Sequence, residues 1–355
     1  MKLSSKKNPA LVLSGGGMKA AAFHIGVCLA LRDKGFNFAG GTKKEVKEAK
    51  YPKNLTFKNY VGSSAGSVIA TFLANGFCLD SIIDAFTQGE GLTDFTRKTD
   101  KKEIKKALEP ITYRKLFGIS FKGASPARLL SSLFLSKKSF DGGIESLLKQ
   151  RLKVTGFFDV KNMEKYINEQ VSEGRSFKDL GVELSIIATH LDYAKKVVFG
   201  KESETKASKQ VEYAGYASIS EAVAASTAIP PVFSPFGITN DEGKEMFFID
   251  GEIRDTLSTH VAAEHGADLV IASYSMAPYN YNSKIGSLND FGIPAIINQA
   301  LYQMIQQKIE SFVDHRKNVA DIVNSVKGYL KEIDVPEKQR KHLLQIILDL
   351  SLIHI

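Results

Sequence analysis

The sequence predicts an α/β fold in which a central, mostly parallel sheet is flanked by helices. Two observations favour it: apolar strand-like stretches alternate with helix-like stretches, and two of the strand-like stretches run through glycine-rich turns into helix-like ones. A chain of 355 residues with 43% hydrophobic residues can also bury a large core. The predicted strands lie near residues 10–13, 59–61, 183–188, 196–199, 246–249 and 269–273.

The first glycine-rich turn, at residues 14–19, follows the strand predicted at residues 10–13 and leads into a helix-like stretch. Three glycines at a helix N-terminus leave backbone N–H groups unpaired, where they can stabilise a developing negative charge. We therefore interpret this turn as an oxyanion hole, formed by Gly15, Gly16, Gly17, Met18 and Lys19.

A nucleotide site is the alternative interpretation of the same turn. Gly15, Gly17 and Ala20 fit the dinucleotide-binding fingerprint, and Asp33 follows at a suitable distance. However, Asp33 lies at the polar end of the same predicted helix, whereas the ribose-binding acid belongs at the tip of the next strand. No Gly-Lys-Ser or Gly-Lys-Thr follows the glycines, which argues against a P-loop.

The second glycine-rich turn, at residues 62–66, reads Gly-Ser-Ser-Ala-Gly and matches G-x-S-x-G. It lies between the strand predicted at residues 59–61 and a helix-like stretch, which is the order found in a nucleophile elbow. Ser64 is then the nucleophile, and Gly62 and Gly66 permit the sharp turn. A glycine-bounded turn that caps a helix is the plainer alternative.

A serine nucleophile needs a base, and Asp250 is the best candidate. It ends the strand predicted at residues 246–249 and is followed by Gly251, which leaves its carboxylate an open approach. A simple turn residue is the alternative for an Asp-Gly pair. His260 and His265 follow Asp250 in the chain order of an α/β-hydrolase triad, but we interpret them as helix residues because their surroundings are helix-like.

Four stretches of the chain resemble the patatin-like phospholipase family in the family's order: SGGGMKAAAFHIGVCLAL, YVGSSAGSVIATFLANG, SISEAVAASTAIPPVFSPF and FFIDGEIRDTLSTHVAAEHGADLVIA. Together they span residues 14 to 272, most of the chain. The resemblance implies a patatin-like α/β fold and a hydrolase of lipid esters. It also implies that Ser64 is the nucleophile, that Asp250 is the base of a Ser-Asp dyad without histidine, and that residues 15–17 form the oxyanion loop.

Three residues depart from the usual pattern of that family. Lys19 stands where arginine is usual, Ala20 where glycine is frequent, and Glu252 where a small residue usually follows Asp-Gly. Lys19 keeps a positive charge near the oxyanion loop. We expect Glu252, as a second carboxylate beside Asp250, to raise the pKa of the base.

Positive charge is concentrated between residues 97 and 138, where twelve basic and three acidic residues give +9, against +8 for the whole chain. Phenylalanines and leucines lie among the basic residues, a pattern that suits an anionic membrane surface better than nucleic acid. We expect residues 97–140 to form a helical basic flap. Its predicted membrane contacts are Lys101, Lys102, Lys105, Lys106, Phe117 and Phe121.

The character of the chain changes to helical after about residue 285. Apolar residues recur there at steps of three and four, an amphipathic stripe that we expect to pack on the core: Ile297, Leu301, Met304, Ile305, Ile309, Phe312 and Val313. We predict a catalytic α/β domain over residues 1–285, with the flap inserted, and a helical C-terminal extension over residues 286–355.

The two cysteines, Cys28 and Cys78, lie in apolar helix-like surroundings, which disfavours a disulfide framework and favours a reducing compartment. Removing the N-terminus as a signal peptide would delete the first glycine-rich turn. We expect a cytoplasmic protein or one peripheral at a membrane surface, with export by a route without cleavage left open. No residue cluster has metal-ligand spacing, so no metal and no cofactor is expected.

These features predict a serine acyl hydrolase of phospholipase A type, which cleaves lipid carboxyl esters by a Ser-Asp dyad through an acyl-enzyme. Its partners would be a phospholipid or other lipid ester and an anionic membrane surface, without nucleic acid. Two alternatives are a Ser-His-Asp esterase acting on small esters and a catalytically decayed module that binds membranes or lipids.

Overall fold

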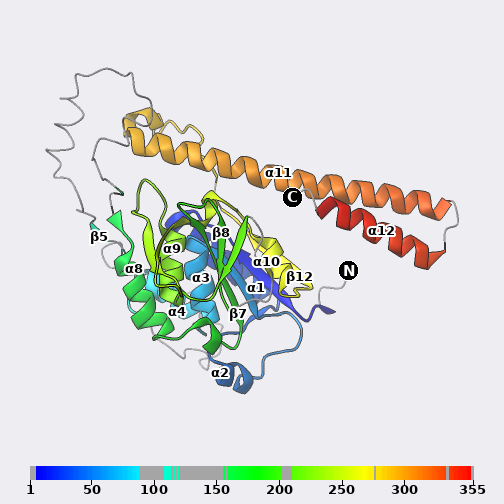
Figure 1. The fold of residues 1–355 in the computed structure, drawn as a ribbon, viewed down its shortest axis with the longest axis horizontal. Coiled ribbons are helices and arrows are strands. Elements are labelled where there is room, and N and C mark those ends of the chain that lie inside the picture. The colour runs from blue at the N-terminus through cyan, green and yellow to red at the C-terminus, as the bar shows by residue number, and fades with distance from the viewer. Residues whose placement is uncertain are drawn as a thin grey trace.

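A mixed sheet of eight strands forms the centre of the computed structural model (Figure 1). The structure describes residues 5–87, 108–112, 116, 118–119, 155–156, 158–201, 210–275, 277–332 and 336–352. Four neighbouring strands run parallel: β12 (Leu269–Ser273), β1 (Pro9–Leu13), β4 (Asn59–Ser63) and β7 (Glu183–His190). Helices flank this sheet, and the predicted α/β fold with a mostly parallel central sheet is confirmed.

The other four strands lie on the two sides of β7. On the side that β4 also occupies, β11 (Glu245–Asp250) runs antiparallel to β7, and β10 (Phe236–Thr239) runs antiparallel to β11. On the other edge lie β8 (Lys196–Phe199), antiparallel to β7, and β9 (Val211–Ala214), parallel to β8. All six predicted strands are present. The sequence pattern misses β9 and β10 because both are short, mostly half-exposed and mixed in polarity.

Side chains of the central strands alternate between two buried faces. In β1, Leu11 and Leu13 join the larger core cluster, whereas Ala10 and Val12 join the smaller one. Burial on both faces explains why these strands read as continuous apolar runs.

Helices on the two faces of the sheet contribute further residues to the two clusters. The larger cluster includes α1 (Gly17–Asp33), α3 (Ala65–Ala74) and α9 (Ile219–Thr227), and the smaller one includes α10 (Thr259–Glu264). All ten residues of α3 are buried, so this helix lies inside the fold. Other described elements of the α/β part include α2 (Lys43–Glu48), α4 (Leu79–Thr87), α8 (Lys161–Tyr166) with its continuation η2 (Ile167–Ser172), η3 (Phe177–Asp179), and the two-residue strands β2 (Asn37–Phe38), β3 (Thr56–Phe57), β5 (Gly118–Ile119) and β6 (Phe158–Asp159).

The register on β7 brings the ends of β4 and β11 together. Parallel β4 pairs with β7 as far as Ser63, opposite Ile187, and antiparallel β11 ends with Asp250, opposite Ala188. Strand β8 pairs with both Ile187 and Ala188 from the other side, so β4 and β11 share one edge of β7 and meet end to end. The last residue of β11 therefore lies beside the residue that follows β4, although the two are far apart in the sequence.

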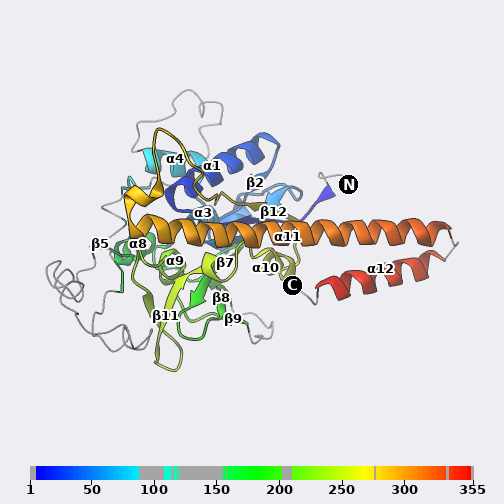
Figure 2. The same ribbon diagram turned by 90° about the horizontal axis from the view of Figure 1, so that it is seen from above.

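The predicted helical C-terminal segment is present as α11 (Ile293–Glu332) and α12 (Glu337–Leu352). Figures 1 and 2 show α11 crossing the α/β part and projecting beyond it, where α12 runs back beside it. Lys308 Nζ of α11 donates a hydrogen bond to Ile253 O (2.7 Å), which connects the helix to the segment after β11.

Only part of the amphipathic stripe of α11 is buried. Ile305 and Ile309 are buried, whereas Ile297, Met304 and Val313 are exposed. The prediction that the whole stripe packs on the core is therefore wrong for these three. Only one side of the helix is buried, and Met304, as the neighbour of Ile305, points about 100° around the helix from it.

Most of the predicted basic flap at residues 97–140 lies outside the described residues, including Lys101, Lys102, Lys105, Lys106, Phe117 and Phe121. Two residues that are described, Gly118 and Ile119, form β5, so they are extended and not helical. Ile111 and Leu116 are buried. The division into residues 1–285 and 286–355 stays a prediction.

Candidate functional site

Ser64 lies on the sharp turn between β4 and α3. Its backbone has φ 50° and ψ −125°, a left-handed conformation that is strained for a residue with a side chain. A Cβ at Gly62 would lie 2.5 Å from Ser67 Cα, and one at Gly66 would lie 2.2 Å from Leu13 O, so only glycine fits at either position. This strand, strained serine and helix have the geometry of a nucleophile elbow.

Buried hydroxyl groups hold this turn in place. The Ser64 N–H donates to Ser226 Oγ (2.8 Å), and Ser226 Oγ donates to Ile187 O of β7 (2.6 Å). Ser67 Oγ donates to Ser64 O (2.6 Å). The turn is thus connected to α9, β7 and α3. Sequence reasoning did not single out Ser226, and its position in the third stretch that resembles the family is the only signal for it.

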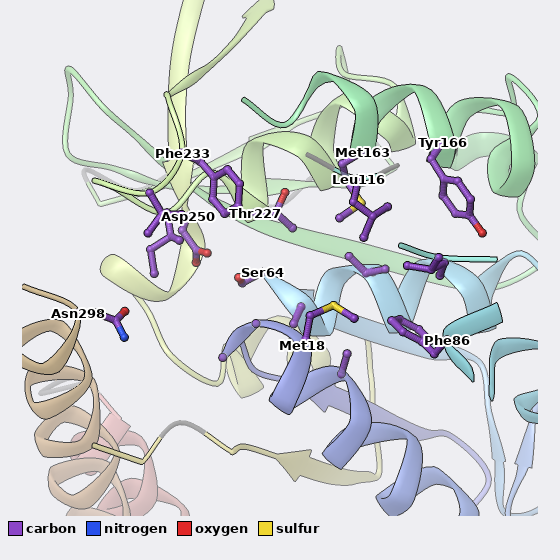
Figure 3. Close-up of a pocket in the computed structure, with 18 of the residues that line it drawn as sticks. Met18, Ser64, Phe86, Leu116, Met163, Tyr166, Thr227, Phe233, Asp250 and Asn298 are labelled. Atoms are coloured by element: carbon purple, nitrogen blue, oxygen red, sulfur yellow. The ribbon is translucent and has the colours of Figure 1, made fainter. Parts of the chain in front are cut away.

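Asp250 occupies the end of β11 and is completely buried. Its N–H donates to Ala228 O (3.0 Å), and its Oδ1 accepts from the Glu252 N–H (2.9 Å). Its Oδ2 makes no hydrogen bond of normal geometry with any described residue. Figure 3 shows the carboxyl group pointing toward the Ser64 hydroxyl. The topology on β7 therefore presents one unpaired carboxyl oxygen to the serine.

Burial raises the pKa of Asp250 to about 7, although the Ser64 hydroxyl and the Glu252 amide both act to lower it. The expectation that the Glu252 carboxylate raises the pKa of Asp250 is wrong: the groups that raise this pKa do not include Glu252, and the Glu252 amide acts to lower it. Burial, followed by the negative charge of Asp250, raises the pKa of Glu252 to about 8. Burial thus favours the protonated form of both carboxyl groups.

Gly251 follows Asp250 at the point where the chain packs against Ile187 of β7 and Ser63 of β4. A Cβ there would lie 2.3 Å from Ile187 O and 2.6 Å from Ser63 Oγ. A side chain at this position would push β11 away from β4, which explains why a glycine flanks the buried carboxylate.

The glycine loop enters α1 beside the elbow. Gly16 and Gly17 have φ values of 130° and 65°, which glycine adopts without strain. Both line the same pocket as Ser64, as does Met18, and the first amides of a helix have no partner within the helix. Gly15 is placed differently, because its N–H donates to Glu252 Oε1 (2.7 Å). Lys19 is exposed and does not line this pocket.

An apolar pocket of about 210 Å³ begins at Ser64 and Asp250. Figure 3 shows it extending from these two residues to Phe86 and Tyr166 at the far end. Ser64, just before α3, and Val68 and Phe72 within it are spaced four residues apart, and all three line the pocket. Its other apolar lining residues are Met18, Ala21, Ile111, Leu116, Met163, Ile229, Val232 and Phe233.

A second cavity, of about 580 Å³, adjoins the first at Asn298 and Tyr302 of α11, which line both. Lys19 lines the second cavity and is the only basic side chain among its described lining residues. Sequence reasoning gave no sign that α11 borders the site, because nothing local in a helix marks which distant loop it crosses.

Histidine is absent from the described lining of the pocket that contains Ser64. His24 is buried, with Nδ1 near Ser273 Oγ and Nε2 near Ser14 O, both at 2.8 Å. His260 contacts Lys196 and Asp255. Of the seven histidines, His354 alone lies outside the described residues.

Within the described part of the chain, no cluster of three or more histidine, cysteine or acidic residues has the arrangement of a metal site. No helix described here combines the length and the apolar character needed to cross a bilayer.

Comparison with known proteins places most of the chain in one match. The family model described as patatin-like phospholipase matches residues 11–263. Among solved structures, the chain is similar to the crystal structure of VipD from Legionella pneumophila, with 21% sequence identity and a TM-score of 0.34. This match covers 75% of the present chain and 49% of the VipD chain, so it reaches about half the length of VipD.

Proposed function

Because the chain belongs to the patatin-like phospholipase family, we propose that it is a serine acyl hydrolase that cleaves lipid carboxyl esters with Ser64 and Asp250. The observation that carries this proposal is the meeting of the strained serine and the buried carboxyl group at the mouth of an apolar pocket. An acyl chain suits that pocket, and its ester carbonyl would then lie next to Ser64.

In the proposed reaction, ionised Asp250 takes the proton of the Ser64 hydroxyl as Ser64 Oγ attacks the ester carbonyl. The amides of Gly16, Gly17 and Met18 stabilise the tetrahedral oxyanion, each donor contributing about 3 kcal/mol to the transition state. Protonated Asp250 then gives its proton to the departing alcohol, and a water molecule activated by the same carboxylate releases the fatty acid. No metal takes part in these steps.

Phospholipids are the proposed substrates because of the second cavity. With the acyl chain in the apolar pocket, the remainder of the lipid would pass Asn298 and Tyr302 into the cavity that Lys19 lines. The ammonium group of Lys19 suits a phosphate there. Docking on an anionic membrane surface through the basic segment at residues 97–140 stays a prediction.

Product analysis tests this function directly. Wild type and Ser64→Ala would be incubated with phosphatidylcholine that carries two different acyl chains, and with a triacylglycerol as the neutral lipid. We expect wild type to release free fatty acid and lysophospholipid, with less release from the neutral lipid. Equal release by Ser64→Ala, or binding of phospholipid without any turnover, would contradict the proposal, and the second result would favour a lipid-binding module.

The rate should depend on pH through Asp250. Its pKa is raised to about 7, and only the ionised form accepts a proton, so kcat/KM should fall below about pH 7 by about tenfold for each pH unit. The measurement is kcat/KM on a short-chain nitrophenyl ester between pH 5 and pH 9, with circular dichroism at each pH to verify folding. A constant rate down to pH 5 would exclude a buried carboxylate as the base.

Filling the pocket should shorten the acyl chains that the enzyme accepts. Val68 lies one helical turn after Ser64 and lines the pocket, so Val68→Phe should lower kcat/KM on long-chain esters by about tenfold or more and spare a short-chain ester. Val313→Phe, at an exposed position of α11, is the matched control. If Val68→Phe affected both esters equally, the acyl chain would have to bind elsewhere.

A further inference from the structure

A second buried carboxyl group lies directly behind the proposed catalytic residues. Glu252 is completely buried in η4 (Gly251–Ile253), the short helical turn that follows β11, and does not line the pocket. Its Oε1 accepts the hydrogen bond from the Gly15 N–H (2.7 Å). A carboxyl group is expensive to bury, so its retention inside the fold calls for specific partners.

The Glu252 side chain also fits tightly against the glycine loop and the elbow. A Cβ on Gly15 would lie 2.6 Å from Glu252 Cγ and 2.7 Å from Ser64 Cβ. Gly15 is thus enclosed between the carboxyl side chain and the proposed nucleophile. A movement of Glu252 would release the start of the loop whose later amides face Ser64.

Two neighbouring buried atoms remain without a hydrogen bond of normal geometry among the described residues: Glu252 Oε2 and Ser63 Oγ. The Ser63 hydroxyl is near enough to act on the Glu252 carboxyl group and oppose the rise in its pKa. One hydrogen bond between these atoms satisfies both of them: a protonated Oε2 donates it to Ser63 Oγ, and an ionised Oε2 accepts it from the hydroxyl.

The electrostatic surroundings favour this protonated form. Burial and the adjacent Asp250 raise the pKa of Glu252 to about 8, while the Gly15 amide and the hydroxyls of Ser63 and Thr256 act in the opposite direction. Across η4, the Lys308 ammonium of α11 is bonded to the Ile253 carbonyl, and it is not among the groups that shift Glu252.

We propose that Glu252 is a positioning residue: as a neutral carboxylic acid it connects Gly15 to Ser63 and so holds the amides of Gly16 and Gly17 beside Ser64. This inference rests on the proposed hydrolase function for its kinetic consequences. It assigns the Gly15 amide to Glu252, so that the oxyanion is left to the amides that follow. Asp250 remains the group that exchanges protons with substrate.

Two substitutions at Glu252 test whether its hydrogen bonds, rather than a negative charge, position the glycine loop. Gln can accept from Gly15 and donate to Ser63, so Glu252→Gln should keep kcat within about threefold at pH 7. Glu252→Ala removes both contacts and should lower kcat about a hundredfold, as expected when a catalytic group is misplaced by about 1 Å. Glu45→Ala is the matched control, because Glu45 also accepts a backbone N–H (Thr42, 2.7 Å) but lies at the surface away from the pocket.

The pH profile provides a further test. Above about pH 8 Glu252 ionises, its hydrogen bond with Ser63 reverses direction, and a negative charge is added beside Asp250 and the oxyanion loop. The wild-type rate should therefore decline at alkaline pH, and this decline should be absent in Glu252→Gln. A Gln variant as slow as the Ala variant, a fully active and folded Ala variant, or an unchanged alkaline limb would each overturn the proposal.

A stability measurement keeps the inference separate from the function. The unfolded chain releases the Glu252 proton near pH 4.5, while the folded chain keeps it to about pH 8, so the free energy of unfolding should decrease as pH rises through this window. The free energy of unfolding, measured with denaturant at several pH values, should depend less steeply on pH in Glu252→Gln, by the amount that corresponds to about one proton. If that difference is found but no lipid is hydrolysed, the neutral buried Glu252 stands and the hydrolase proposal fails; an equal slope overturns the neutral form that the proposal requires.

Discussion

Ser64→Ala is expected to lower ester hydrolysis by roughly 10⁵-fold or more, the size of effect seen when a serine nucleophile is removed. The strained turn places the Ser64 hydroxyl at the pocket mouth where Asp250 lies, whereas the hydroxyl of Thr227, which also lines the pocket, donates to backbone carbonyls of its own helix. The substitution should leave the fold intact, since the backbone N–H of residue 64 still donates to Ser226. The rate on a short-chain nitrophenyl ester measures the loss.

Covalent labelling checks the same assignment without turnover. A fluorophosphonate probe should label wild type at Ser64 and leave Ser64→Ala unlabelled. Ser185→Ala is the matched control, because Ser185 is a buried serine of β7 outside the pocket. Labelling that persists in Ser64→Ala would show that another residue is the nucleophile.

Asp250→Asn is expected to lower kcat about 10⁴-fold, a loss typical of a carboxylate that supports a serine nucleophile. The amide keeps the acceptor for the Glu252 N–H but cannot take the serine proton. Circular dichroism should show wild-type folding, and steady-state kinetics measures kcat.

Histidine variants decide between a dyad and a triad. His260→Gln and His265→Gln should keep nearly full activity, because neither residue lines the pocket. A folded histidine variant as inactive as Asp250→Asn would instead support a Ser-His-Asp esterase. The same outcome would assign Asp250 to orienting the histidine.

Local features of the sequence were sufficient for the strands and turns around the site. The two glycine-rich turns and the Asp-Gly pair can be recognised in the sequence because they require glycine. Backbone segments approach so closely at Gly62, Gly66 and Gly251 that no side chain fits there. The predicted strands β1, β4, β7 and β8 are buried along nearly their whole length, and β11 and β12 contain apolar runs at residues 246–249 and 269–272 although both are partly exposed. Strands β9 and β10 lack such a run because both are short and mixed in polarity.

The residues that distant segments of the chain contribute to the site could not be recognised from the sequence. Ser226, Asn298 and Tyr302 reach the site only because α9 and α11 are folded against it. The sequence suggested that Glu252 would act on Asp250, but its bond to Gly15 depends on the packing of η4 under the glycine loop. A sequence pattern reflects interactions between residues that are close in the chain, whereas these contacts join residues that are far apart in it.

The sequence by itself determined that this chain forms an α/β sheet with a serine elbow, a glycine loop and a carboxylate at strand ends, because each depends on local polarity and on glycine. Only the tertiary structure decided that Asp250 faces Ser64, since that meeting follows from β4 and β11 sharing one edge of β7. It also decided that the Gly15 amide belongs to Glu252 and that α11 borders the pocket. The physical reason is that register and packing set distances between residues that are remote in the chain.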